Sequence, residues 1–404
     1  MFGVALGAGV AGLAVGAASG FAGGRASAAT AAADAGHDFF GAHQAGITTP
    51  VQEHLHFAAF DMMPRTDRDD LIALLQDWSY AASRMTQGLE ASATGAVGGD
   101  PQTPPDDTGE ALGLPASALT VTFGFGPGLF HDAADGDRYG LADRLPVGLE
   151  RLPAFLSDDI DHDSSHGDLC IQVCADDPQV TVHAIRNLSR IAFGRARLRW
   201  SQLGFGKTSR TTTDQATPRN LFGYKDGTAN ILADDSTALE DHVWVSATDE
   251  PAWLAGGSYL VARKIAMNIE TWDRVRLAEQ NRIIGRDKAK GAPLSGGDEF
   301  SEPDFHGAAI DANSHVRLAH PDRNHGIRIL RRGFNYVDGN NGLGRLDAGL
   351  FFLSYQRDPS QFITLQRQLS TDLMNEYVRH VGTGIWAIPR GAETGSYVGA
   401  ELFA

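Results

Sequence analysis

The sequence predicts an α+β fold made of two ferredoxin-like (β-α-β-β-α-β) halves. Three observations support this fold class. The order strand, helix, strand, strand, helix, strand occurs once in residues 51–205, it occurs again in 257–389, and a connection near 206–250 separates the two copies. The chain has 404 residues, which is enough for two domains with large cores. We therefore expect domains at 51–215 and 216–404.

The first half contains four predicted strands and two predicted helices. Stretches rich in β-branched and aromatic residues indicate the strands, and apolar residues at helical spacing indicate the helices. The strands are expected at 51–61, 119–125, 168–175 and 195–205, and the helices at 66–85 and 178–191. Thr66 is expected to cap the first helix, whose first turn is acidic, and Pro178 opens the second.

The second half repeats this order. The predicted strands are 257–269, 327–336, 347–356 and 383–389, and the predicted helices are 270–284 and 359–380. Two cysteines, Cys170 and Cys174, lie four residues apart on one predicted strand, roughly 13 Å from each other at 3.3 Å per residue. That distance excludes a disulfide bond between them, so we expect both to be buried thiols.

The charge balance narrows the class of partner. The formal net charge is −16, and a strongly negative protein is repelled by nucleic acid and by anionic membrane surfaces. Hydrophobic residues make up 42% of the chain and charged residues 21%, which is typical of a globular protein.

The N-terminus resembles an export signal. Residues 1–24 carry no charge and are mostly small or apolar, and "ASA" at 26–28 offers small residues at a cleavage site. No lysine or arginine precedes the apolar run, which departs from a complete signal. We expect 1–28 to be an export segment, 29–50 to be a flexible terminus, and the mature chain to have no integral membrane span.

The stretch "NLFGYKDGTANI" at 220–231 places Asp226 and Gly227 in the connection between the halves. An Asp-Gly pair is also a common turn, because glycine tolerates a positive φ and aspartate bonds to its own backbone. Connections between domains are frequent ligand sites, which favours a functional interpretation of the carboxylate.

A loop with three histidines lies before the strand at 327–336. His315, His320 and His325 are five residues apart, a spacing that does not suit a helical metal face, and the chain lacks the partners of a zinc motif. The histidines could simply lie on a solvated loop. A haem iron, however, needs only one axial imidazole, and a loop can supply it.

Two adjacent arginines, Arg331 and Arg332, interrupt the apolar strand that follows. Neighbouring residues of a strand point to opposite faces, so one of the two should be buried and should need an anion. A carboxylate, a histidine and an arginine are the groups that haem peroxide chemistry requires.

These motifs resemble those of the dye-decolorizing peroxidases, in the exported bacterial branch that includes the haem deferrochelatase/peroxidases of iron-uptake operons. "GYKDG" fits the family's GxxDG motif, and "SHVRLAHP", "ILRRGFNY", "FFLSYQRDP" and "GDLCIQVCADDPQV" are similar to that branch; the resemblance covers nearly all of 50–404. It implies two ferredoxin-like halves of the dimeric α+β barrel type, with one haem b per chain held between the distal loop and the C-terminal, haem-binding half.

The resemblance also implies roles for individual residues. His315 is expected to be the proximal iron ligand, Asp226 the distal acid–base, and Arg332, at family spacing from His315, the distal cation. Asp372 is the candidate carboxylate behind the proximal imidazole, with Glu376 second. The remaining expected haem contacts are Gly227, Thr228 and Ala229 at the haem edge, His320, Pro321 and Asp322 near the propionates, and Phe334 and Leu353 as the distal wall.

The expected activity is that of a haem peroxidase that uses H₂O₂ to oxidise dyes, phenols or other one-electron donors. Two alternatives remain open: a deferrochelatase that releases iron from haem, which would use the same site, and a haem carrier, which would need His315 but neither Asp226 nor the arginine. The resemblance further implies export to the periplasm or the exterior by the twin-arginine route, and it allows a homo-oligomer.

Overall fold

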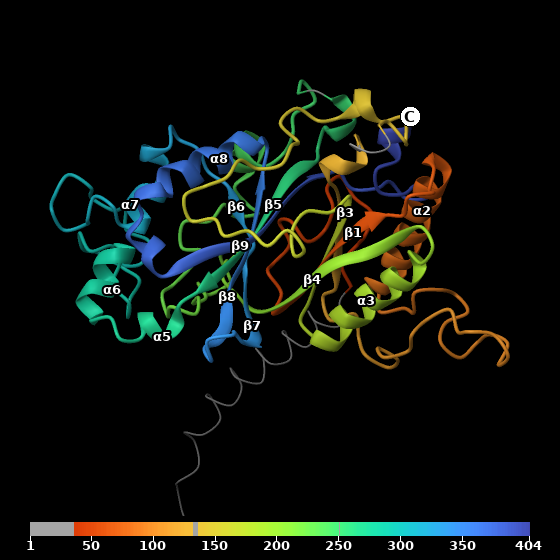
Figure 1. The fold of residues 1–404 in the computed structure, drawn as a ribbon, viewed down its shortest axis with the longest axis horizontal. Helices are drawn as coiled ribbons and strands as arrows, with labels where there is room; N and C mark the ends of the chain where they lie inside the picture. Colours follow the sequence, from red (N-terminus) through yellow and green to blue (C-terminus); the bar gives the residue numbers. More distant parts are fainter. Residues whose placement is uncertain (1–35, 132–135, 250) are drawn as a thin grey trace, which may run out of the picture.

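The computed structural model describes residues 36–131, 136–249 and 251–404, in which helices surround one large antiparallel sheet (Figure 1). The N-terminal half contains β1 (His54–Met62), α2 (Arg68–Met85), β2 (Thr120–Phe125), β3 (Leu169–Ala175), α3 (Pro178–Ile191) and β4 (Ala196–Lys207). The C-terminal half contains β5 (Ser258–Met267), α5 (Ile269–Trp272), α6 (Leu277–Ile284), α7 (His315–Ala319), β6 (Leu330–Arg331), β7 (Phe334–Asn340), β8 (Leu346–Gln356), α8 (Pro359–Gln368) and β9 (Val378–Ile388), and α4 (Ser236–His242) lies in the connection.

The strand order confirms the predicted pair of ferredoxin-like halves. Neighbouring strands follow the order β5-β9-β2-β3-β1-β4-β7-β8-β6, and β5 also pairs with β8, so the sheet closes into a barrel. Each half keeps the ferredoxin-like order, β2-β3-β1-β4 in one and β9-β5-β8-β7 in the other. Short ladders join the strands of the two halves, at Phe125–Ala387 and at Phe205–Asn335, and an isolated bridge links Asp158 to His380 of β9.

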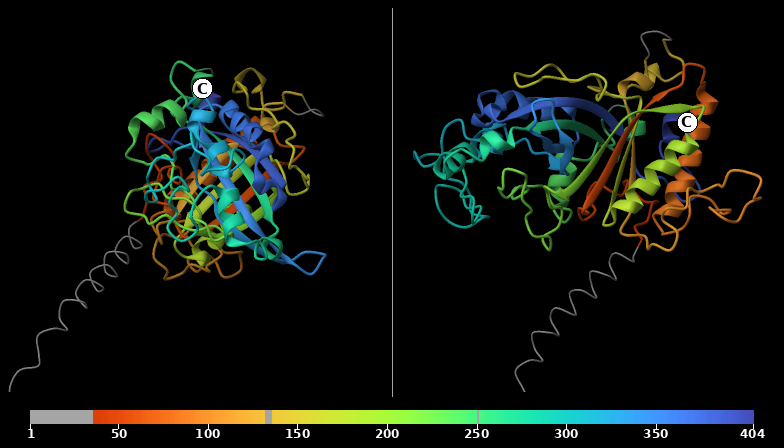
Figure 2. Two further views of the ribbon diagram at one scale, coloured as in Figure 1. Left: turned by 90° about the vertical axis from the view of Figure 1, so that its left-hand side faces the viewer. Right: turned by 60° about the horizontal axis from the view of Figure 1, so that its bottom comes forward.

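The barrel has an apolar interior and a helix-covered outer surface. Leu55, Phe57 and Ala59 of β1 belong to the interior cluster, which also contains side chains from the strands of the C-terminal half. The intervening Ala58 and Phe60 pack outward, since successive strand residues face opposite sides. The helices of the two halves lie on opposite outer sides of the barrel (Figure 2).

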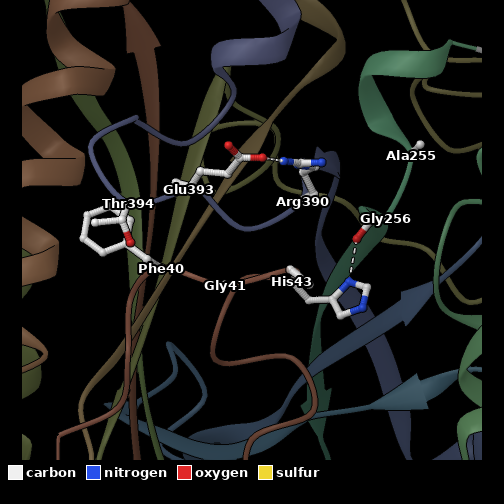
Figure 3. Close-up of a pocket in the computed structure, with 10 residues that line it drawn as sticks. Phe40, Gly41, His43, Ala255, Gly256, Arg390, Glu393 and Thr394 are labelled. Atoms are coloured by element: carbon white, nitrogen blue, oxygen red, sulfur yellow. Dashed lines mark hydrogen bonds and ion pairs between the residues drawn. The ribbon is translucent and has the colours of Figure 1, made fainter.

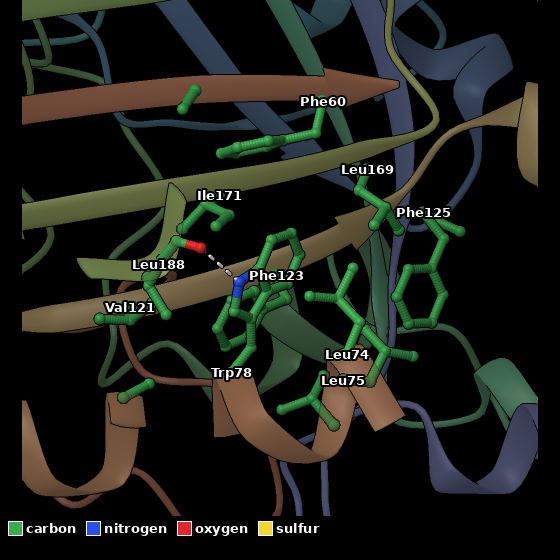
Figure 4. Close-up of a cluster of buried hydrophobic side chains, with 14 of the residues drawn as sticks. Phe60, Leu74, Leu75, Trp78, Val121, Phe123, Phe125, Leu169, Ile171 and Leu188 are labelled. Carbon is green, nitrogen blue, oxygen red and sulfur yellow. Dashed lines mark hydrogen bonds between the residues drawn. The ribbon is translucent and has the colours of Figure 1, made fainter. Parts of the chain in front are cut away.

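Helix α2 covers the outer face of the N-terminal half. Trp78 stacks on Phe123 with ring centroids 5.6 Å apart, and its indole N–H donates to the carbonyl of Leu188 at 2.8 Å (Figure 4). The helix is capped by Asp67 rather than by the expected Thr66. Asp67 and Asp70 form a reciprocal capping box, whereas the Thr66 hydroxyl donates to the carbonyl of Met63.

Two predicted helices of the C-terminal half are shorter than expected. The segment 270–284 divides into α5 and α6, and the helix predicted at 359–380 ends at Gln368. Short 3₁₀ turns follow α8, and β9 begins at Val378, well before the expected 383. Asp372 caps one of these turns by accepting from the N–H of Met374, so the chain turns where a helix was expected.

The described part of the segment expected to be a flexible terminus, residues 36–50, is packed against the barrel. Phe39 and Ile47 are buried, and the Gln44 amide donates to the carbonyls of Phe123 and Pro389, one from each half. The expectation of flexibility was wrong for these residues because their backbone carbonyls satisfy polar groups inside the barrel.

Arg332 is the clearest of those polar groups. Its side chain is fully buried, and its guanidinium donates to the carbonyl of Thr49 at 2.5 Å, to that of Ile47, and to the side-chain oxygen of Gln52. A buried arginine was expected to need an anion, but neutral oxygens of the N-terminal segment serve instead. Arg332 therefore holds residues 47–52 in the barrel.

Two further expectations concern sulfur and membranes. Cys170 and Cys174 are free and buried, as predicted, and burial raises the pKa of both thiols. Among the helices of the described ranges, none combines the length and the apolar character needed to cross a membrane. The export segment expected at 1–28 lies outside the described residues.

Replacing Arg332 with methionine should lower the free energy of unfolding by about 2–4 kcal/mol, because several buried oxygens lose their donor at once. Urea unfolding of the purified protein, followed by circular dichroism, measures this loss. The matched control is Arg331→Met, the same change on the adjacent, partly exposed residue, which should cost about 1 kcal/mol or less. Equal losses for the two variants would contradict the structural role of Arg332.

Candidate active site

The loop that carries Asp226 is held in one conformation by its backbone. Gly227 has φ +90°, and a Cβ on it would lie 2.7 Å from the Cα of Ser209, so the position requires glycine. The N–H of Asp226 donates to the carbonyl of Pro218 at 2.9 Å. The Asp226 side chain is 15% exposed, so the carboxylate lies at the edge of the interior rather than free in solvent.

Asn230 joins this loop to β6. Its side-chain oxygen accepts from the N–H of Arg331 at 2.8 Å, and its amide nitrogen donates to the carbonyls of Arg331 and Arg210 at 2.9 and 2.8 Å. The Asn230 side chain thus forms with the Arg331 backbone the pair of hydrogen bonds that a neighbouring strand would form. This pairing brings the loop and the strand together, and no sequence motif had singled out Asn230.

Asp226 is paired with Arg331. The Arg331 guanidinium donates through Nη1 to Asp226 Oδ1 at 2.7 Å, and the Asn220 amide donates to Oδ2 at 3.2 Å. Both carboxylate oxygens therefore have a donor. The Arg331 side chain is 28% exposed, unlike that of its buried neighbour.

The sequence-based choice of Arg332 as the distal cation was wrong by one residue. Arg331 pairs with Ser354 of β8 and faces outward, whereas Arg332 faces the barrel interior. A shift of one residue along a strand reverses the face, so counting from His315 could not separate the two arginines.

His315 lies at the N-terminus of α7 and is oriented by Asp372. Its Nδ1–H donates to Asp372 Oδ2 at 2.6 Å, which leaves Nε2 with its lone pair. Burial lowers the pKa of His315, but the charge and hydrogen bond of Asp372 more than offset this, and the net shift is upward. Asp372 is thus in the position expected of the carboxylate behind the imidazole, while Glu376 is exposed.

His315 lies on the same site as Asp226 and Arg331. The charges of both residues act on its pKa, Asp226 raising it and Arg331 lowering it. The imidazole is 33% exposed, so it is accessible from this side. The fold therefore brings together Asp226, His315 and Arg331, although Asp226 is far from the other two in the sequence.

The other expected contacts divide into two groups. Thr228 donates to Glu299, which also accepts from Lys225. His320 lies 2.9 Å from Glu302. The acidic loop that carries Glu299 and Glu302 therefore contacts both the Asp226 loop and the segment of His320. Gly227 is buried, Pro321 is partly exposed, and Ala229 and Asp322 are exposed beside these contacts.

Phe334 and Leu353 do not form the expected wall. Both are fully buried in the interior cluster with Arg332, and neither has surface to offer to the outer face. Phe352, one residue from Leu353, lies on the face of Arg331 and is only partly buried. The correction has the same cause as that of Arg332, because all three assignments had the wrong phase of the strand.

The donor set of the site fits a haem better than a metal ion bound by protein alone. Among the described residues, no group of three His, Cys, Asp or Glu side chains could hold a metal ion. His315 instead offers one imidazole nitrogen with a carboxylate behind it, and partly buried apolar side chains lie nearby, including Val316 and Phe352. A porphyrin supplies four ligands itself and needs one axial imidazole and an apolar setting.

A separate pocket of about 600 Å³ lies between the N-terminal segment, the start of β5 and the C-terminal segment (Figure 3). His43 donates there to the carbonyl of Gly256 at 2.7 Å and stacks on Trp244, and Arg390 pairs with Glu393. None of the expected site residues lines this pocket, and its charged groups are already paired with each other.

Comparison with known proteins finds similarity along nearly the whole chain. The family model "Dyp-type peroxidase, N-terminal" matches residues 44–206, and "Dyp-type peroxidase, C-terminal" matches 217–393. The chain is similar to the deferrochelatase of Escherichia coli strain K12, with 37% identity over 375 residues, 90% of this chain and 86% of the relative. It is equally similar to the deferrochelatase of Yersinia pseudotuberculosis, with 37% identity over 376 residues, 90% of this chain and 84% of the relative.

Solved structures give the same result. An oxyferrous complex of DtpA from Streptomyces lividans is 38% identical, with a TM-score of 0.84 over 93% of this chain and 99% of that one. A DyP-type peroxidase from Cellulomonas bogoriensis is 37% identical, with a TM-score of 0.81 over 92% and 99%.

Replacing Asp372 with asparagine should weaken haem binding about 10–100-fold, because the imidazole loses the carboxylate that fixes its tautomer and raises its basicity. Titration of haem into the haem-free protein, followed in the Soret region, measures the affinity. Glu376→Gln is the matched control and should bind haem like the wild type. Equal effects of the two changes would show that Asp372 does not support His315.

Proposed function

The chain belongs to the Dyp-type peroxidase family and is a haem b-dependent peroxidase, and from this premise we propose that His315 holds the haem iron while Asp226 and Arg331 act on H₂O₂. The observation that carries the proposal is the 2.7 Å pair of Asp226 and Arg331 on the site that His315 also shares. The family models and the relatives confirm the family resemblance that was drawn from the sequence. The roles of the individual residues are our proposal.

The protein's part in binding haem rests on His315. Nε2 is the nitrogen available to iron, since Nδ1 is engaged by Asp372. Haem b, when bound there, would supply the redox chemistry with H₂O₂. The hydrogen bond to Asp372 increases electron density on the imidazole, which supports the more oxidised states of the site.

Asp226 acts as the acid–base group of this proposal. A carboxylate oxygen accepts one proton from H₂O₂ and returns it to the departing oxygen, which leaves as water. Arg331 holds the carboxylate through Nη1, and its guanidinium has further N–H donors that stabilise the charge developing on that oxygen. A carrier protein would need His315 alone, so the paired Asp226 and Arg331 favour turnover.

Small one-electron donors, such as phenols and dyes, complete the cycle by returning two electrons.

We also propose that the protein is exported, because residues 1–24 are uncharged and apolar and a small-residue site follows at 26–28. Fractionation of the producing cells tests export, and protein found only in the cytoplasm would contradict it.

The reaction with H₂O₂ tests the residue roles. Asp226→Asn should slow the peroxide-dependent change of the Soret band by about 10²–10⁴-fold, because the proton acceptor is lost while the shape is kept. Arg331→Leu should slow it by about 10²-fold, because the charge stabilisation is lost. Stopped-flow absorption gives both rates.

Asp143→Asn is the control for these variants, since Asp143 is exposed on the 3₁₀ turn Ala142–Arg144 of the N-terminal half and should leave the rate unchanged. Haem content is measured alongside, and it should match the wild type in all three variants. A wild-type rate in Asp226→Asn would contradict the acid–base role of this carboxylate.

Iron release from haem is a second candidate function, favoured by the similarity to relatives named deferrochelatase. Release requires two protons on the ring nitrogens as the iron leaves. If the chain has this activity, haem-loaded protein under reducing conditions should yield protoporphyrin with its characteristic fluorescence. Intact haem after many hours, with normal peroxidase turnover, would exclude this activity under those conditions.

A further inference from the structure

Asn220 contacts the second oxygen of Asp226. Its amide nitrogen donates to Asp226 Oδ2 at 3.2 Å, and its side-chain oxygen accepts from the N–H of Phe222 at 3.1 Å. The first bond reaches the group that handles the proton, and the second closes a local turn. The proposed function gave Asn220 no part.

The two bonds together determine which way the amide points. An amide has one accepting end and one donating end, and the N–H of Phe222 requires the accepting end. The donating end must therefore face Asp226. The backbone reinforces this orientation, since the N–H of Asn220 donates to the carbonyl of Tyr224 at 3.1 Å and its carbonyl accepts from Gly223 at 2.9 Å.

With Arg331 on Oδ1 and Asn220 on Oδ2, the plane of the Asp226 carboxylate is held from both sides. The carboxylate can therefore turn only by breaking one of these two hydrogen bonds. Other charges also act near this site: those of His315 on α7, of Lys225 paired with Glu299, and of Arg286, which interacts with Arg331.

We infer that Asn220 is a positioning residue for the peroxide reaction, fixing the orientation of the Asp226 carboxylate by donating to its second oxygen. This inference rests on the proposed role of Asp226. Its specific consequence is that loss of this donor slows the reaction with H₂O₂ without lowering the haem content.

Two substitutions remove the donor while keeping the turn. In Asn220→Ser the hydroxyl can still accept from Phe222 but is too short to reach Asp226, and no charge is added. Asn220→Asp keeps the shape and the acceptor but places a second carboxylate against Oδ2. Asn281→Asp is the matched control, because the Asn281 oxygen only accepts, from Tyr224 and Lys288.

Each holoenzyme is measured in two ways: the rate of the Soret change with H₂O₂, and the haem content. Asn220→Ser should react about tenfold more slowly, because one hydrogen bond to the carboxylate is lost, and it should keep the wild-type haem content. Asn220→Asp should be slower still, since two neighbouring carboxylates repel each other. Asn281→Asp should react like the wild type.

The outcomes separate this inference from the proposed function. If both Asn220 variants keep the wild-type rate while Asp226→Asn is slow, the role of Asn220 is overturned and that of Asp226 stands. Loss of haem in the Asn220 variants, or equal slowing in Asn281→Asp, would also overturn it, because either would indicate a merely structural residue. If Asp226→Asn reacts like the wild type, both proposals fall together.

Discussion

Adjacent side chains of one short strand point to opposite faces of the barrel wall, one toward the interior of this protein and the other toward its reaction site. Arg331 and Arg332 are adjacent, so their side chains must lie on opposite faces of the barrel wall. The inner one binds carbonyl oxygens of the N-terminal segment, and the outer one binds Asp226. The same stretch of backbone therefore secures the barrel and presents the arginine that pairs with Asp226, and neither arginine could take the other's place.

The site on the outer face is built from two charge-assisted pairs with different neighbours. Asp372 accepts from Nδ1 of His315, which leaves Nε2 unengaged, and Arg331 donates to the Asp226 carboxylate. Hydrogen bonds to the backbone support both pairs. The Asn230 side chain binds the main chain of Arg331, and Asp372 accepts from a backbone N–H of a 3₁₀ turn. Because these hydrogen bonds are directional, they fix the orientation of both pairs of side chains.

Much of the fold and part of the site could be predicted from the sequence. Apolar periodicity is a local property, and it was sufficient for the two β-α-β-β-α-β repeats and for the burial of both cysteines. Asp226 and His315 were chosen because each stands in a short motif, and Asp372 was chosen by spacing; the structure pairs Asp372 with His315. The distal wall was not predictable in this way: Phe334 and Leu353 are strand residues, and which face of their strands becomes the barrel interior is decided only when the sheet closes.

The sequence by itself determined the fold class, the family and the types of chemical group available, because these depend on composition, periodicity and motifs within short stretches. Only the tertiary structure decided which arginine faces Asp226, that Asn220 and Asn230 support the site, and that residues 36–50 belong to the barrel. Those facts depend on the closure of the sheet and on the phase of one strand, which bring residues 47–52, 226 and 331 together across long separations. Contacts of that kind arise when the barrel closes, and no local pattern in the chain specifies them.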